Sequence, residues 1–424
     1  MALLALLALP LIGVFGLLIF KSRWIAVAVS ALTVVMTVII GRYPELLSFF
    51  TSISLPSFAV TPLGLLMLIL TSVIVLAIVL ASDDSPGFLA IILGIQAALF
   101  GVFCAQNGLL FYMFWELTLI PAFFMILGWG TGDKVRIAIR FLLYNLVGSF
   151  ALLTVILYLF LQTHSFAFTD WMAAPLPLAS QVWVLIGLFV AFGIKLPLVP
   201  FHRWQPETYE CLPRSGSMLF SGLLSKLGVY GMLMLMVPLV PHALLVYRPI
   251  VLGIVVMSVL YASLVALAET GFKRIVATVS IAHGSLLAAG IFALTPMGIQ
   301  GSIAQIVAHS LVVAALFLCE PRIRSHFYLG ALFLVVLGSI GLPLTIGFIG
   351  EFLILLGISQ FSLVYAGLAG ISVILGAWAM LTLYQSVQSS TEGTYEFSFS
   401  EDIVVITLIA AIYILGIFPS VVLI

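Results

Sequence analysis

Charged side chains are scarce in this chain. Its 424 residues include 15 Lys or Arg and 15 Asp or Glu, so that 7% of residues are charged and 64% are hydrophobic. Soluble domains carry about 25% charged residues, because a water-exposed surface needs them. The scarcity excludes a soluble enzyme, a nucleic-acid-binding protein with a basic face and a disordered chain. A polytopic membrane protein remains.

Long apolar runs, separated by polar residues, Pro or Gly, predict about fourteen transmembrane helices, because one span needs about 20 apolar residues. We therefore expect an all-α fold in a single membrane domain, 1–424. The expected spans are 1–20, 24–40, 60–81, 87–105, 109–130, 137–161, 181–201, 213–236, 249–268, 273–292, 297–320, 328–357, 360–388 and 402–423.

The basic residues predict an orientation for these spans. Only Arg42 and Arg248 fall in even-numbered loops, and Lys195 and Lys226 fall inside spans. The others lie in or beside odd-numbered loops: Lys21, Arg23, Lys134, Arg136, Arg140, Arg203, Arg214, Lys273, Arg274, Arg322 and Arg324. Because basic residues concentrate on the cytoplasmic side, we expect odd loops to be cytoplasmic and both termini to lie on the outer side.

Six ionisable residues fall within the apolar runs, where a charge costs about 2.5–3.5 kcal/mol on insertion scales. Any one of them alone has a structural explanation, since Lys or Glu can reach the membrane surface and His can bond to a neighbouring helix. Together they predict a polar axis suited to proton transfer, because carboxylate, ammonium and imidazole groups can all change protonation state. The six are Glu116, Lys195, Lys226, His283, His309 and Glu351.

Two spans contain prolines that a regular helix cannot accommodate. Pro197 and Pro200 interrupt span 7 directly after Lys195, and Pro343 interrupts span 12 just before Glu351. The breaks are five spans apart, so they run in opposite directions. We expect two inverted five-helix repeats, spans 4–8 (87–236) and 9–13 (249–388), with spans 1–3 (1–86) peripheral and helix 14 (402–423) following. Broken helices at matching positions of inverted halves indicate an ion path near the midplane.

The chain offers no ligand set for a redox centre or metal. Cys104, Cys211 and Cys319 form neither a CxxC pair nor a metal-binding spacing, and the sequence contains neither GxGxxG nor a Walker loop. We expect no cofactor or metal in this chain.

Several motifs, in order, resemble the antiporter-like subunits of respiratory complex I, the NADH–quinone oxidoreductase. Lys195-x-Pro197 followed by Pro200-x-His202-x-Trp204 is similar to a signature of that family. Glu351, where other members carry Lys, resembles the branch of subunit M or mitochondrial subunit 4. The resemblance covers about residues 60–388, and its motifs lie at 111–121, 140–149, 195–207, 217–231, 270–283, 305–309 and 341–352.

The resemblance implies a proton-translocating subunit of the membrane arm, embedded in the lipid bilayer beside other antiporter-like subunits and without nucleic acid. It implies that Glu116 and Lys195 form a coupling pair, that Lys226, His283 and His309 continue the axis, and that Glu351 leads outward. NADH, FMN, Fe–S clusters and quinone are then expected on partner subunits. A bacterial inner membrane is the expected location.

The chain departs from the family pattern at three places. The segment 206–213 has Tyr209 where the family has His, the loop 321–327 is short, and an acidic residue expected near Thr61 is missing. Other functions stay open: a subunit of a multi-subunit Na+/H+ antiporter or of a membrane-bound hydrogenase, and a structural membrane scaffold. A substrate transporter fits less well, because the polar groups are spread along a path.

The expected mechanism begins with Glu116 close to Lys195, where it would stabilise the ammonium form. Movement of the carboxylate away would release the proton toward Lys226. His283 and His309 would relay it, and Glu351 would hold it before release.

Overall fold

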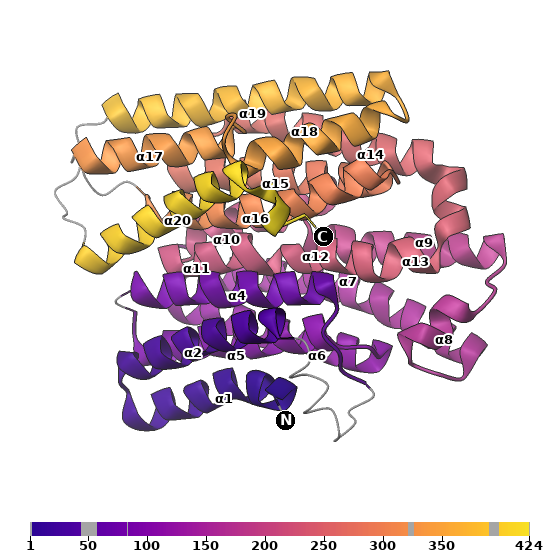
Figure 1. Cartoon of the computed structure of the whole chain (residues 1–424), viewed down its shortest axis with the longest axis horizontal. Coiled ribbons are helices and arrows are strands. Elements are labelled where there is room, and N and C mark those ends of the chain that lie inside the picture. Colours follow the sequence, from indigo (N-terminus) through magenta and orange to yellow (C-terminus); the bar gives the residue numbers. More distant parts are fainter. Residues whose placement is uncertain (1, 44–56, 83, 321–325, 390–397, 424) are drawn as a thin grey trace. The chain divides into compact units, whose positions relative to one another are not determined.

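A computed structural model describes residues 2–43, 57–82, 84–320, 326–389 and 398–423, and these are almost entirely helical (Figure 1). Within these ranges there is no strand, and the only β-type pairing is in two isolated bridges, Phe58 with Ala105 and Asn107 with Ala167. Thirteen helices in the described part of the chain are long and apolar enough to cross a membrane. The predicted all-α membrane fold is confirmed.

Two compact units make up the chain, residues 1–175 and 176–424. The boundary falls inside the predicted first repeat, and the division into peripheral helices and two repeats stays a prediction. The first unit contains α1 (Ala2–Phe20), α2 (Arg23–Arg42), α4 (Pro62–Leu80), α5 (Pro86–Cys104), α6 (Gly108–Trp129), α7 (Lys134–Thr163) and α8 (Phe168–Ala173).

Helix α5 is the centre of the first unit and packs against α1, α2, α4 and α6. Its one polar side chain in mid-helix, Gln96, is fully buried and donates from Nε2 to Thr33 Oγ1 of α2 at 3.2 Å. Thr61, Ser85 and Asn107 cap the starts of α4, α5 and α6 through their side-chain oxygens. These caps satisfy amides that the first turn of a helix leaves free. The polar residues that separate the apolar runs in the sequence therefore mark the starts of helices.

The second unit begins with a broken span. Helix α9 (Leu178–Lys195) ends at a turn, and the chain resumes through η1 (Phe201–Arg203) and α10 (Trp204–Cys211). The eighth span is continuous but changes its winding through α11 (Arg214–Leu219), the π-helix η2 (Phe220–Leu224), α12 (Lys226–Gly231), the π-helix η3 (Met232–Met236) and α13 (Val237–Leu239).

The remaining helices of the second unit include α15 and α16, around which the others pack. They are α14 (Pro241–Ala268), α15 (Phe272–Phe292), α16 (Pro296–Leu318), α17 (His326–Ser339), α18 (Ile346–Ser359), α19 (Leu363–Ser389), α20 (Phe399–Ile417) and η4 (Pro419–Val421). Helix α16 packs against α11, α15, α17, α18 and α20. The 18-residue apolar window of α16 is 100% buried and that of α15 is 94% buried, so their polar side chains avoid lipid.

The predicted helix breaks are confirmed. Span 12 consists of α17 and α18 with residues 340–345 between them, and the prolines of both breaks lie outside regular helix. At the first break the freed groups find new partners: Leu198 N donates to Gly193 O at 2.8 Å, and Val199 N donates to Ser258 Oγ at 2.9 Å. Broken helices are tolerated inside a membrane when neighbouring groups satisfy the backbone in this way.

One helix was not expected from the sequence, and one expectation falls largely outside the described residues. The short helix α8 was not predicted, because six residues carry too little periodicity to identify. Of the loop at 321–327, residues 321–325 lie outside the described part of the chain.

Candidate functional site

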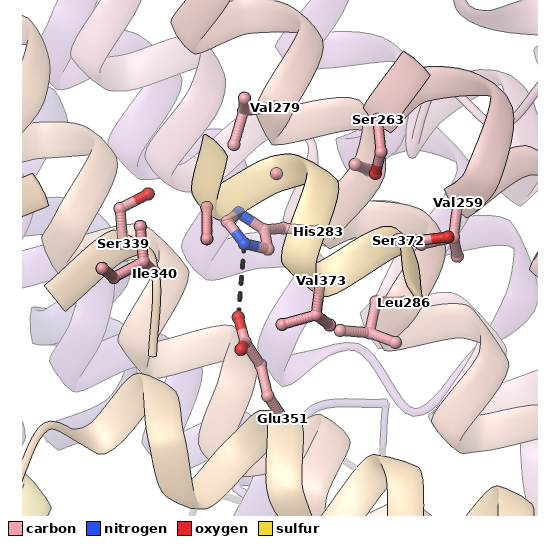
Figure 2. A pocket seen from close by; sticks show the side chains of 13 residues that line it. Val259, Ser263, Val279, His283, Leu286, Ser339, Ile340, Glu351, Ser372 and Val373 are labelled. Atoms are coloured by element: carbon pink, nitrogen blue, oxygen red, sulfur yellow. Dashed lines mark ion pairs between the residues drawn. The ribbon is translucent and has the colours of Figure 1, made fainter. Parts of the chain in front are cut away.

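Four of the six predicted residues form a series of neighbouring side chains inside the second unit. Lys226 Nζ lies 2.7 Å from His309 Nδ1, and the rings of His309 and His283 meet edge to face with centroids 5.5 Å apart. His283 Nε2 lies 3.3 Å from Glu351 Oε1, as Figure 2 shows. The four residues come from four helices, α12, α16, α15 and α18, so the helix packing assembles the series.

This series is shielded from solvent. Lys226 is 1% exposed, His309 4% and Glu351 5%, and the side chain of His283 is 15% exposed. Two cations at 2.7 Å in a poorly polarisable interior repel strongly, so Lys226 and His309 hold at most one excess proton between them. The charged lysine donates to a neutral imidazole, or the protonated imidazole donates to a neutral amine. This geometry suits the passage of a proton.

Lys226 lies two residues after the end of the π-helix η2, a kind of irregularity frequent at functional sites. Its ammonium donates to Ser221 O at 3.2 Å and to Ser225 Oγ at 3.4 Å. Helix α12 also approaches the end of α9 closely, because a Cβ added at Gly228 would lie 2.6 Å from Phe192 O. Glycine at this position therefore allows Lys226 to reach the core beside the first helix break.

Glu351 is held by the second helix break. Its Oε2 lies so near Gly341 that a Cβ there would come within 2.5 Å, and Gly341 has a φ of +65°. Only glycine meets both demands without strain. Gln305 Nε2 of α16 lies 3.5 Å from Glu351 Oε1, and Thr345 caps α18 by accepting from Phe348 N at 3.3 Å. The broken span thus fixes the carboxylate opposite His283.

Lys195 and Glu116 complete the predicted set. Lys195 is the last residue of α9 and is 5% exposed. The next residue, Leu196, packs against Gly228 of α12 and Gly284 of α15, so the break after Lys195 adjoins helices that carry the series. Glu116 lies on α6 in the first unit, with Oε1 buried and without a hydrogen-bond partner among the described residues. Its pairing with Lys195 stays a prediction.

A small cavity opens beside the His283–Glu351 pair (Figure 2). Its volume is about 10 Å³, close to the minimum for one water molecule. Ser263, Ser339 and Ser372 line it together with the ion pair, and Ser263 Oγ has no hydrogen-bond partner in the described part of the chain. Sequence reasoning missed these serines, because an isolated Ser in an apolar run gives no signal of its own.

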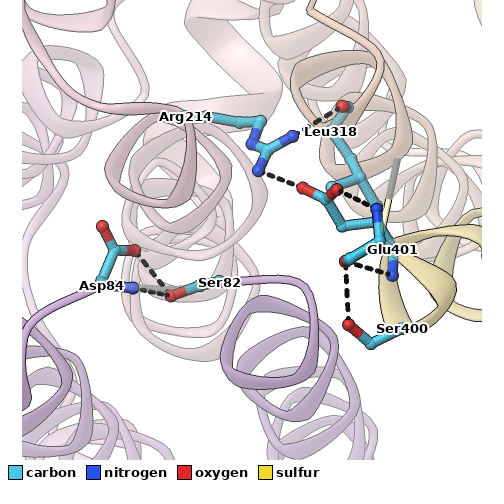
Figure 3. A network of polar contacts seen from close by, with 7 residues as sticks. Ser82, Asp84, Arg214, Leu318, Ser400 and Glu401 are labelled. Atoms are coloured by element: carbon cyan, nitrogen blue, oxygen red, sulfur yellow. Dashed lines mark hydrogen bonds and ion pairs between the residues drawn. The ribbon is translucent and has the colours of Figure 1, made fainter. Parts of the chain in front are cut away.

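Charged residues gather at the ends of several helices of the second unit. Arg214 pairs with Glu401 and donates to Leu318 O at 3.4 Å, as Figure 3 shows. Lys273 Nζ lies 3.3 Å from Glu320 and donates to Leu212 O at 2.8 Å. These contacts join α11, α15, α16 and α20. The basic residues that indicated orientation therefore also connect helices.

Comparison with known proteins identifies the family to which the chain belongs. A family model described as "NADH:quinone oxidoreductase/Mrp antiporter, TM" matches residues 105–376. NADH-quinone oxidoreductase subunit M of Rickettsia prowazekii is 33% identical over 423 residues, which cover 89% of this chain and 86% of that protein. NADH-ubiquinone oxidoreductase chain 4 of Marchantia polymorpha is 34% identical over 350 residues, covering 77% of this chain and 71% of that protein.

Solved structures show the same architecture. A chain in "Respiratory complex I from Thermus thermophilus with bound NADH" has a TM-score of 0.90 and 27% identity, covering 100% of this chain and 96% of that one. A chain of the Mrp complex from Dietzia sp. DQ12-45-1b has a TM-score of 0.86 at 18% identity, covering 100% and 95%, a likeness of fold.

The fold and the buried series define a class, the antiporter-like membrane proteins with two broken helices. More closely, the chain belongs to the NADH:quinone oxidoreductase/Mrp antiporter family of membrane subunits.

Proposed function

We propose that this chain is a proton-translocating subunit in the membrane arm of an NADH:quinone oxidoreductase. One observation carries the proposal: Lys226, His309, His283 and Glu351 form a buried series with contacts of 2.7 Å and 3.3 Å at its two ends. Uncompensated ionisable groups inside a membrane are costly. A connected line of groups that can each bind a proton is the arrangement that translocation needs.

The proton moves along this series from Lys226 to Glu351. The Lys226 ammonium donates to His309 Nδ1 at 2.7 Å, and His309 then gives a proton from its other ring nitrogen toward His283. A water molecule can bridge the two rings, since a proton crosses such a gap by exchange along hydrogen bonds. His283 and the Glu351 carboxylate share the proton at 3.3 Å. Release from Glu351 leaves the series ready to be recharged.

Lys195 and Glu116 act as the switch of this mechanism. A carboxylate near an ammonium stabilises its charged form, so separating Glu116 from Lys195 would drive a proton toward Lys226. The driving force comes from redox chemistry in partner subunits, where NADH, FMN, Fe–S clusters and quinone bind. Other antiporter-like subunits of the membrane arm flank this chain. The membrane is the bacterial inner membrane, with both termini on the outer side.

A subunit of a Na+/H+ antiporter is the second candidate, because the family model covers both classes and the fold matches a chain of an Mrp complex. The two candidates differ in the ion moved and in the source of energy. An NADH-driven complex would acidify vesicles in sodium-free buffer, whereas an antiporter would need a sodium gradient.

The test uses the whole complex purified from its native membrane and reconstituted into lipid vesicles. Lys226→Ala and His309→Ala should lower the number of protons moved per NADH oxidised while the complex still assembles. We expect the rate of proton uptake to fall about 10²-fold, as removal of a positioned proton-transfer group does. His242→Asn is the matched control, since His242 is exposed at the start of α14.

The measurement is the proton-to-electron ratio, from a pH-sensitive dye and inhibitor-sensitive NADH oxidation. A ratio equal to that of the unmodified complex in both alanine variants would exclude the series as the route.

A further inference from the structure

Tyr209 is a buried phenol that the series described above does not use. It lies on α10 and is 0% exposed. Its ring packs edge-on against Phe317, with centroids 5.8 Å apart at 82°, and against Phe220. Within the described part of the chain no group meets its Oη with full hydrogen-bond geometry, although three polar side chains lie close to it. A buried polar atom without a partner costs about 1–3 kcal/mol, so this hydroxyl needs an explanation.

Polar groups surround the hydroxyl of Tyr209. Oη lies near the side chains of Ser221, Gln205 and Ser225. Gln205 is 1% exposed, and its Oε1 also has no hydrogen-bond partner in the described part of the chain. Two unpartnered buried atoms, one a donor and one an acceptor, therefore border the same place. A site with two to four such groups suits one ordered water molecule.

Three serines lead from Tyr209 to Lys226. Ser217, Ser221 and Ser225 recur every four residues from α11 to the residue that follows η2, so they share one side of the span. Ser217 Oγ donates to Tyr209 O at 2.9 Å, Ser225 Oγ donates to Ser221 O at 2.8 Å, and Lys226 Nζ donates to Ser225 Oγ at 3.4 Å. The three hydroxyls therefore line the stretch between α10 and Lys226; Ser217 and Ser225 donate to backbone carbonyls, and Ser221 Oγ donates to Ser280 Oγ at 3.4 Å.

The other side of α10 meets charged residues. Glu210, next to Tyr209, has a side chain 53% exposed and lies 3.6 Å from Arg274, which is 40% exposed. Cys211 and Thr208 on the same short helix are buried. Helix α10 therefore has one charged, accessible face and one buried face that carries Tyr209 and Gln205, and it connects an aqueous surface with the interior.

We infer that Tyr209 and Gln205 hold a buried water molecule, and that Tyr209, Gln205, Ser221 and Ser225 form the arm through which Lys226 takes up its proton. We call these four residues the uptake arm. The inference rests on the proposed function and adds the point at which the proton reaches the series.

The chemistry of the arm needs no ionised phenol. Burial raises the pKa of the Tyr209 hydroxyl, so the side chain stays neutral at physiological pH. Oη accepts a proton from the surface side while its own proton passes to the buried water, and the water passes one on toward Ser225 and a neutral Lys226 amine. One O–H bond forms as another breaks at each oxygen, and only Lys226 gains charge.

The test compares Tyr209→Phe, Gln205→Leu and their combination in the whole complex. Each change keeps the approximate shape of the side chain and removes one polar group that would bind the buried water molecule. We expect each single variant to lower the rate of proton translocation roughly tenfold or more, and the double variant to be no worse, because both remove the same relay. Tyr328→Phe is the matched control, since Tyr328 is a buried tyrosine whose hydroxyl bonds to Cys319 O and to none of the four arm residues.

The outcomes separate the two proposals. Normal translocation in Tyr209→Phe while Lys226→Ala is inactive overturns the uptake arm alone, and normal translocation in Lys226→Ala overturns the proposed function. If the losses of translocation rate in the two single variants add up in the double variant, the two residues do not act in one relay. That result, or an equal loss in Tyr328→Phe, means a structural role and overturns the inference. If Tyr209→Phe does not assemble, a high-resolution map of the unmodified complex decides: water density between Oη and Gln205 Oε1 supports the arm, and its absence there overturns it.

Discussion

At the scale of single residues, the chain keeps its ionisable groups where other helices can share their charge. Lys226 is 1% exposed, yet it contacts His309 Nδ1, Ser221 O and Ser225 Oγ. Removing one partner of a buried charged pair leaves the other uncompensated. The four residues of the series should therefore behave as one unit, and the effects of their substitutions should not add.

Gly341→Ala tests how tightly the second break positions Glu351. The added methyl would lie 2.5 Å from Glu351 Oε2, and a non-glycine residue at φ +65° costs about 1–2 kcal/mol. We expect the carboxylate to move away from His283 and the proton-to-electron ratio to fall, with NADH oxidation as the internal reference.

Gly367→Ala in α19 provides the control for this variant, because nothing lies within 4 Å of its added methyl. It should assemble and translocate protons like the unmodified complex. Equal ratios in Gly341→Ala and Gly367→Ala would contradict the positioning role of Gly341.

The sequence identified the six ionisable residues, because apolar surroundings make such groups conspicuous. It did not reveal which of them touch. Lys226 and His309 are 83 positions apart, and their contact depends on how α12 and α16 pack. Tyr209 was noted as a departure from the family pattern, but its burial beside Gln205 and Ser225 follows from the way α10 folds back, which no local pattern encodes.

At the scale of elements, composition predicts the spans well and their irregularities in part. The apolar runs predicted the membrane-spanning helices, and the prolines predicted both helix breaks. The π-helices η2 and η3 had no signal, since their sequences, such as Phe220–Leu224, are also compatible with regular helix. The sequence did not predict helix α10 as an element distinct from the loop after span 7. Its eight residues are too few to show a clear helical pattern.

The pair of Arg214 and Glu401 is expected to fasten α20 to α11 and α16. Its side chains are 11% and 7% exposed, so removing Glu401 takes the balancing carboxylate from a mostly buried guanidinium. Glu401→Ala should lower stability by about 3–5 kcal/mol, seen as a lower temperature of unfolding in detergent.

The double variant Arg214→Met with Glu401→Leu should recover most of this loss, because it leaves no unpaired charge. An unfolding temperature in Glu401→Ala equal to that of the unmodified protein would mean that other contacts hold α20 in place.

At the scale of the whole molecule, apolar side chains lie on the surface and ionisable side chains lie inside, the reverse of a soluble protein. Large apolar side chains are exposed, such as Trp24 at 71%, Trp183 at 73% and Trp378 at 62%, while the series of ionisable side chains lies inside. The exposed apolar side chains contact lipid chains in a membrane, and tryptophan is favoured near the lipid headgroups.

The three cysteines should be protected from alkylation in the native protein. Cys104 and Cys319 are 0% exposed and Cys211 is 3% exposed. A maleimide reagent should therefore label the folded chain only slowly and all three sites after denaturation, as counted by mass spectrometry. An engineered cysteine in place of exposed Ser389 or Asp133 serves as a positive control. Rapid labelling of all three native cysteines would contradict the described packing.

The complete burial of α16 has a consequence for how the chain is made. Its apolar window lies entirely inside the protein and carries Gln305 and His309, which lipid solvates poorly. A helix of this kind is unstable as a lone span, so α15 and α17 to α20 must gather round it soon after it leaves the insertion machinery. Biogenesis of this chain therefore depends on the covering of its most buried span, and a nascent chain arrested directly after α16 would remain a substrate for membrane quality control.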